Sequence, residues 1–102
     1  MGIVLALKVS MNKLKTEDNV RQLIEDYGYE DVVIFSNPSY ASAFIVVSED
    51  NRAVYSYNEM VKSLCKNDKM NELDAIEFIE FNTLRALPYY KNSPIILHEI
   101  TN

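Results

Sequence analysis

The spacing of apolar residues changes several times along this 102-residue chain, and these changes constrain its fold more than any other feature. Residues 16–28 follow a helical period, residues 31–57 contain short β-rich runs, residues 58–87 return to a helical period, and residues 94–100 are β-rich again. A chain of this length forms one domain around one core. The segment order predicts a small α+β domain, with about three helices packed on one face of a mainly antiparallel sheet.

The first predicted helix has recognisable signals at both ends. Thr16 is the predicted N-cap, and Glu17 and Asp18 follow it where the helix dipole favours negative charge. Gly28 stands just past the last turn, where a left-handed backbone conformation costs little for glycine. Between these ends, apolar residues recur at spacings of three and four, at Val20, Leu23, Ile24 and Tyr27.

The β-rich runs in the middle of the chain predict a hairpin. Residues 42–48 and 53–57 flank the polar loop EDNR, in which Asp50 or Asn51 can take a positive φ. The preceding run, residues 31–35, predicts either a strand or an extended connector. The C-terminal run predicts a closing strand.

The N-terminal fifteen residues form a separate unit in the predicted organisation. Residues 3–9 alternate weakly, so residues 1–15 are predicted to be an N-terminal extension or an edge strand of the domain formed by residues 16–102. Met11 is an alternative natural start. The apolar run is far shorter than the roughly 20 residues of a membrane span, and no basic residue precedes it as in a secretory signal. The single cysteine, Cys65, cannot form an intramolecular disulfide, so an oxidising compartment is not implied. Together these features predict a cytoplasmic protein with no membrane association.

Two more helices are predicted in the second half of the chain. Ser56 or Asn58 caps the first of them, and Asn71 caps the second, which runs to about Leu87 before Pro88. This last helix has one broad apolar side and a second, smaller one. The smaller side either packs within the domain or faces a partner. Its members are Leu73, Phe81 and Leu84.

The end of the last helix collects polar and aromatic residues, namely Asn82, Thr83, Arg85, Pro88 and Tyr89. Asn and Thr side chains can bond to nearby backbone, and a basic residue in the last turn complements the helix dipole. Proline then prevents clean continuation of the helix. These roles predict a structural motif that ends the helix. A ligand contact is the alternative if the same residues border a pocket.

The net charge of −5 is unevenly distributed. Residues 16–31 hold six acids and one base, Arg21, whereas residues 1–15 hold three lysines and no acid. No basic stripe is present to displace counterions, so direct nucleic-acid binding is not expected. The acids predict either a solvated helix face or an acidic face that binds a basic protein. They are Glu17, Asp18, Glu25, Asp26, Glu30 and Asp31.

The sequence offers little catalytic chemistry. His98 and Cys65 are each the only residue of their type, so one nucleophile–base pair is conceivable. Cys65 falls on a helical apolar face and His98 on the terminal strand, which favours a buried thiol and a surface imidazole. Several Cys or His ligands at short spacing, as in zinc sites, are absent from the sequence. We therefore expect a protein without enzymatic activity, metal or cofactor.

Two stretches resemble a group of short proteins of unknown function from low-GC Gram-positive bacteria and their phages and mobile elements. These stretches are AIEFIEFNTLRALPYY, followed by SPIIL, and AFIVVSEDNRAVYSYNEMV, so the resemblance covers roughly residues 29–98. Relatives in this group often have Asp-Gly where this chain has Asp50 and Asn51, and glycine where it has Tyr90. The resemblance implies a compact single domain and brings no catalytic residues. Residues 1–15 lie outside it.

Three hypotheses for function follow. The first is a small acidic protein-interaction module, in one version an inhibitor carried by a phage or mobile element that mimics nucleic acid and binds a basic nucleic-acid-binding protein. The second is a self-associating structural protein, a homodimer joined through the smaller apolar side of the last helix or an edge strand. The third is a small enzyme that uses Cys65 and His98.

Overall fold

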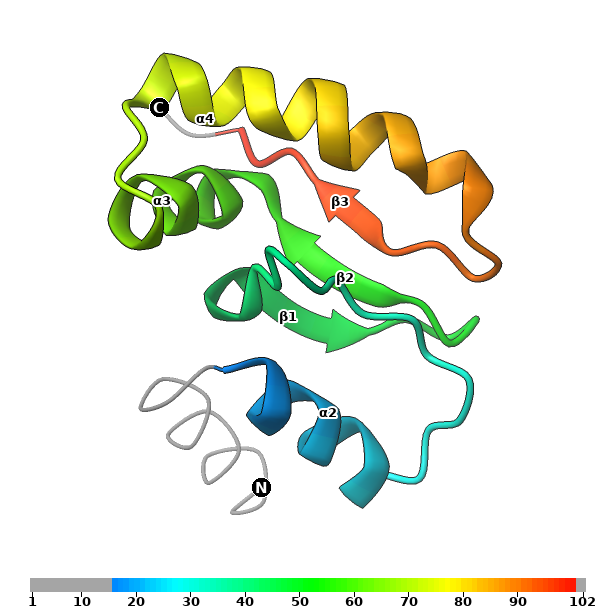
Figure 1. Cartoon of the computed structure of the whole chain (residues 1–102). Helices are drawn as coiled ribbons and strands as arrows, with labels where there is room; N and C mark the ends of the chain where they lie inside the picture. Colours follow the sequence, from blue (N-terminus) through cyan, green and yellow to red (C-terminus); the bar gives the residue numbers. More distant parts are fainter. Residues whose placement is uncertain (1–15, 101–102) are drawn as a thin grey trace.

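The computed structural model describes residues 16–100, which form three α-helices and three strands in the order α-β-β-α-α-β (Figure 1). The predicted α+β class is therefore confirmed. A predicted strand at residues 3–9 lies outside the described residues. In chain order the elements are α2 (Glu17–Asp26), a 3₁₀ turn η1 (Ala41–Ala43), β1 (Phe44–Val47), β2 (Ala53–Ser56), α3 (Tyr57–Asn67), α4 (Glu72–Phe78) and β3 (Ile95–Leu97); α4 continues as the π-helical turn η2 (Ile79–Thr83) and the 3₁₀ segment η3 (Leu84–Tyr89).

The sheet has the strand order β1-β2-β3. β1 and β2 form the predicted antiparallel hairpin, in which Val47 lies opposite Ala53. Asn51 in the connecting loop has a φ of 60°, as predicted for one of the two loop residues. β3 pairs with β2 in the parallel direction, with Val54 opposite Ile95, so the sheet is mixed.

Residues 31–35 are an extended connector and not a strand, which decides between the two predicted alternatives. The backbone N–H of Phe35 donates to the Tyr55 hydroxyl at 3.1 Å. A side chain therefore accepts the hydrogen bond that a backbone carbonyl of a neighbouring strand accepts in a sheet. The Phe35 and Tyr55 rings also pack at 4.7 Å between centroids. The connector is thus held on the core by an aromatic contact.

The helix ends follow the predicted signals. Thr16, Ser56 and Asn71 each accept a hydrogen bond from the backbone N–H three residues later, at 3.2, 3.2 and 2.8 Å. These bonds satisfy N–H groups that the first helical turn leaves without partners. Gly28 has a φ of +80° and ends α2 as predicted.

The last helix extends further than the sequence predicts. Its run continues through Pro88 to Tyr89 because the backbone changes to π-helical and then 3₁₀ geometry after Phe78. The Asn82 side-chain amide donates to the Phe78 carbonyl at 3.2 Å at the start of this change. Side-chain bonds of this kind compete with the regular helical pattern.

The core lies between the helices and the sheet and includes an aromatic cluster around Tyr55. The Tyr55 ring is 1% exposed and packs against Phe35 and Phe44, and Phe35 packs against Tyr40. Tyr40 has a φ of 49°, and its hydroxyl lies 2.6 Å from the buried Thr83 hydroxyl. This bond joins the loop before η1 to the π-helical turn. The remaining buried apolar residues are Val20, Ile24, Ala41, Ala43, Ala53, Val54, Met60, Leu64, Ala75, Ile79 and Pro94.

Candidate functional site

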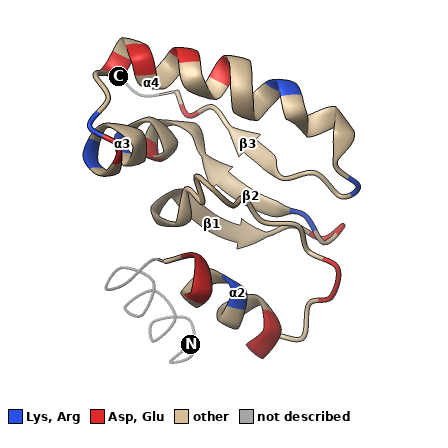
Figure 2. Cartoon of the chain, in the orientation of Figure 1, with Lys and Arg blue, Asp and Glu red and all other residues tan. Residues whose placement is uncertain are grey.

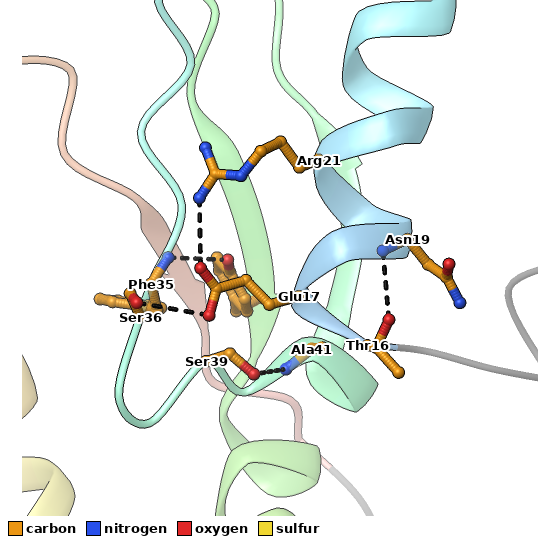
Figure 3. A network of polar contacts seen from close by, with 9 residues as sticks. Thr16, Glu17, Asn19, Arg21, Phe35, Ser36, Ser39 and Ala41 are labelled. Atoms are coloured by element: carbon orange, nitrogen blue, oxygen red, sulfur yellow. Dashed lines mark hydrogen bonds and ion pairs between the residues drawn. The ribbon is translucent and has the colours of Figure 1, made fainter.

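The six predicted acidic residues lie on α2 and the chain that follows it (Figure 2). Glu17 is engaged in structural contacts. Its carboxylate accepts from the Arg21 guanidinium at 3.2 Å and from the Ser36 hydroxyl at 3.3 Å, which ties the start of α2 to the connector (Figure 3). Glu17 therefore stabilises the fold locally and contributes little free charge to a binding face.

The other five acids are exposed but do not form one continuous array. Asp18 and Glu25 are seven residues apart and share the side of α2 away from the buried Val20 and Ile24. Asp26 is also on the exposed side of α2, one turn after Gln22, whose side-chain amide donates to its carboxylate at 2.8 Å. Glu30 and Asp31 follow the helix end. The acidic face thus has two parts.

An apolar groove lies between α2 and β1, and sequence reasoning missed it. Its volume is about 210 Å³. The lining contains no charged residue and consists of Leu23, Ile24, Tyr27, Tyr29, Phe44, Ile45, Val46 and Val47. Four of these large apolar residues are exposed: Tyr27 49%, Tyr29 39%, Ile45 37% and Val46 51%. This groove is the candidate functional site.

A bulge in β1 explains why the sequence did not predict the groove. Regular strands alternate between the two faces of a sheet, which would expose only every second residue. The pairing register shifts between Phe44 and Val46, and both Ile45 and Val46 are exposed. Bulges re-aim side chains in this way. The signal in the sequence is the pair Tyr27 and Tyr29 beyond the last turn of α2, where the helix itself cannot bury them.

The smaller apolar side of the last helix is divided by the fold. Leu73 and Phe81 are 64% and 63% exposed, whereas Leu84 packs against the core. The Arg85 guanidinium lies over the Phe81 ring, 6.0 Å from its centroid. Because Leu73 and Phe81 are eight residues apart, about 12 Å separates them along the helix. Leu73 and Phe81 are therefore two separate exposed side chains and do not form one continuous apolar surface.

The predicted helix-end motif divides between the core and the surface. Thr83 is buried, and its hydroxyl is hydrogen-bonded to the Tyr40 hydroxyl. The Asn82 side chain donates to the Phe78 carbonyl, whereas Tyr89 is 90% exposed. Asn82 and Thr83 also border a cleft of about 220 Å³ that contains no charged residue. Arg85, Pro88 and Tyr89 are outside its lining. The cleft is also lined by Phe35, Ser36, Asn37, Pro38, Tyr40, Phe78, Ala86 and Tyr90.

Cys65 and His98 have separate neighbours. The His98 ring stacks on Tyr57 at 4.5 Å, at the first residue of α3, whereas Cys65 lies eight residues further along that helix and packs against the core. No hydrogen bond joins the two side chains in the part of the chain that the structure describes. Among residues 16–100, no group of three His, Cys, Asp or Glu residues is arranged to hold a metal ion.

No helix within residues 16–100 is long and apolar enough to cross a bilayer. No protein family, curated protein or solved structure matches the chain at a significant level. The resemblance to short proteins of Gram-positive bacteria and their phages therefore stays a prediction.

Proposed function

We propose that this protein is a non-enzymatic protein-interaction module that binds a partner through the α2–β1 groove. The observation that carries the proposal is the exposure of Tyr27, Tyr29, Ile45 and Val46 around one apolar groove. Apolar side chains gathered in one concave place are typical of interaction sites, whereas scattered ones are ordinary. Complete burial of an exposed apolar side chain contributes about 1.5–3 kcal/mol. These side chains are already about half-buried, so a partner that covers the groove gains roughly half of that from each of them.

The proposal takes the partner to be a cytoplasmic protein, which agrees with a lone cysteine that has no disulfide partner in the chain. In the narrower version, the acids mimic nucleic acid and occupy a basic protein. That version receives less support, because Glu17 is bound to Arg21 and the other acids are divided between α2 and the chain after it. A source in a Gram-positive bacterium or its phage remains part of the proposal on the resemblance alone.

Capture from a lysate of the native host at about 0.05 M and about 1 M salt tests the proposed function. Exposed charges are screened over about 3 Å at 1 M salt, whereas apolar burial persists. We expect a specific protein to be retained at high salt, and its identity can be established by mass spectrometry. Capture only at low salt would support the nucleic-acid mimic instead. Capture of no protein other than the chain itself would contradict both versions.

Self-association is a second candidate, and it rests on Leu73 and Phe81, each more than three-fifths exposed. If these residues join two copies, Phe81→Glu should halve the apparent mass in solution, because it places a charge in the interface. Light scattering during size-exclusion chromatography measures this mass. Val46→Glu is the matched control on the other face and should leave the mass unchanged. A wild-type protein that elutes as a monomer at micromolar concentrations would exclude this interface.

A further inference from the structure

The charged residues around the α2–β1 groove indicate what kind of partner it accepts. We infer that the groove binds a short segment of a partner protein in which two or three apolar side chains are flanked by lysine or arginine. This inference rests on the proposed function and adds the chemistry of the bound segment. It is carried by charge complementarity, because the walls of the groove are apolar and the chain around it is acidic.

The chain segments that line the groove, residues 23–29 and 44–47, together contain acids and no Lys or Arg, and so do the residues that directly follow each of them. Residues 23–31 and 44–50 together hold six acidic residues. All six are exposed, and Figure 2 shows their clustering at the C-terminal end of α2, on the chain after it and at the hairpin loop. They are Glu25, Asp26, Glu30, Asp31, Glu49 and Asp50, of which Glu25 is on the side of α2 away from the groove.

Two nearby arginines already have partners, one of which is Asp50 from the six acids. Arg21 pairs with Glu17, and Arg52 pairs with Asp50 at 3.7 Å and donates to the Ser93 carbonyl at 2.7 Å. Within residues 16–100, no ion pair involves Asp26, Glu30 or Glu49. These three acids therefore remain available to cations of a bound segment.

The C-terminal end of α2 also favours a basic partner. The C-terminal end of a helix carries partial negative charge and favours basic residues there. α2 has no basic residue in its last turn, and it carries Glu25 and Asp26 there. These acids work against the local stability of the helix. A lysine or arginine of a partner beside Asp26 would relieve the repulsion, and the apolar lining would hold the adjacent side chains.

The test uses three fluorescein-labelled peptides with the full-length protein. The first has the sequence Lys-Lys-Val-Ile-Val-Lys-Lys, the second replaces all lysines with glutamates, and the third replaces the apolar core with serines. Fluorescence anisotropy at about 0.15 M salt gives the dissociation constants. We expect the basic–apolar peptide to bind at least about tenfold tighter than either of the others, because only it satisfies both features of the groove.

Protein variants then locate the binding. Val46→Asp should weaken binding of the basic–apolar peptide about tenfold or more, because the charge enters the apolar lining. Tyr29→Ser provides a second lining variant, and Leu73→Asp is the control on the other face, with no expected effect. Asp26→Lys combined with Glu30→Lys should weaken the basic peptide, strengthen the acidic one and leave the melting temperature unchanged or raised. Loss of folding does not produce this reversal of preference.

Several results would overturn the inference. Equal binding of the basic–apolar and acidic–apolar peptides would do so while leaving the proposed function intact, because host-partner capture does not depend on the sign of charge. Binding of no peptide by a protein that still captures its partner would do the same. Tight binding only after residues 1–10 are removed would show that the chain's own N-terminal residues occupy the groove. A mass that Val46→Asp halves would show that a second copy does.

Discussion

Tyr55→Ala is expected to lower the free energy of unfolding by about 3–5 kcal/mol, the usual cost of truncating a large aromatic side chain in a core. Tyr55 is 1% exposed and contacts both the Phe35 and Phe44 rings. Its loss opens a cavity between the sheet and the extended connector, and it releases the Phe35 backbone N–H. Urea denaturation followed by circular dichroism measures the change.

The Tyr55→Phe variant separates the hydroxyl from the ring. It keeps the aromatic packing but leaves the buried Phe35 N–H without its partner, which costs about 1–3 kcal/mol. The ordering expected is wild type, then phenylalanine, then alanine. Equal loss in both variants would show that the hydroxyl carries the whole contribution, and that the ring contacts add nothing.

Stability should also depend on pH in the alkaline range. Burial raises the pKa of Tyr55 to about 12, and burial also raises the pKa of Tyr40 and of Tyr57. Because these pKa values are higher in the folded protein, the folded state holds its protons above pH 10 and the unfolded state loses them. The stabilisation is complete below about pH 10 and is lost as the pH rises through about 12. Tyr55→Phe should reduce this loss.

The second large effect is expected at Ile79, where α4 changes to π-helical geometry. Ile79 is fully buried, and Ile79→Ala should lower the free energy of unfolding by about 2–5 kcal/mol. Leu73→Ala in the same helix removes a side chain that is 64% exposed, so its cost should stay within about 0.5 kcal/mol. The pair tests which side of this helix faces the core.

Thermal or urea denaturation of both variants under the same conditions gives the comparison. If Leu73→Ala proved as costly as Ile79→Ala, the helix would be buried on two sides, and an exposed Leu73 could not then contribute to self-association. A small cost at Ile79 would mean that the π-helical turn repacks around the cavity. Unfolding of Ile79→Ala at room temperature would agree with the prediction, since domains of this size have little stability in reserve.

The sequence predicted those parts of the fold that local chemistry determines. The caps at Thr16, Ser56 and Asn71 and the glycine end at Gly28 each depend on residues within four positions, and all are present. The hairpin follows from its two β-rich runs for the same reason. Local signals of this kind are readable because the interacting groups are neighbours in the sequence.

The features that could not be predicted from the sequence depend on contacts between residues far apart in the chain. Residues 31–35 form a connector and not a strand, and the backbone N–H of Phe35 donates to the hydroxyl of Tyr55, twenty residues later. The continuation of the last helix beyond Leu87 depends on a change of helical geometry near Thr83, which is anchored on Tyr40. The spacing of residues within one segment cannot predict contacts between distant segments.

The candidate site was only partly predictable. The acids of α2 are visible in the sequence, but their separation into two groups and the use of Glu17 by Arg21 and Ser36 require the fold. The groove depends on a bulge in β1 that exposes Ile45 and Val46 together. Regular alternation along the strand predicts that one of these two residues is buried. The groove therefore lies at the position where β1 departs from regular alternation.

The central claim is that a partner binds in the α2–β1 groove, and hydrogen–deuterium exchange of the captured complex tests it most directly. Bound and free protein are compared by mass spectrometry of peptic fragments. The account predicts slower exchange on binding in residues 23–29 and 44–47, with residues 73–84 unchanged. Slower exchange confined to residues 73–84 would contradict this claim, because the partner would then bind the last helix and not the groove.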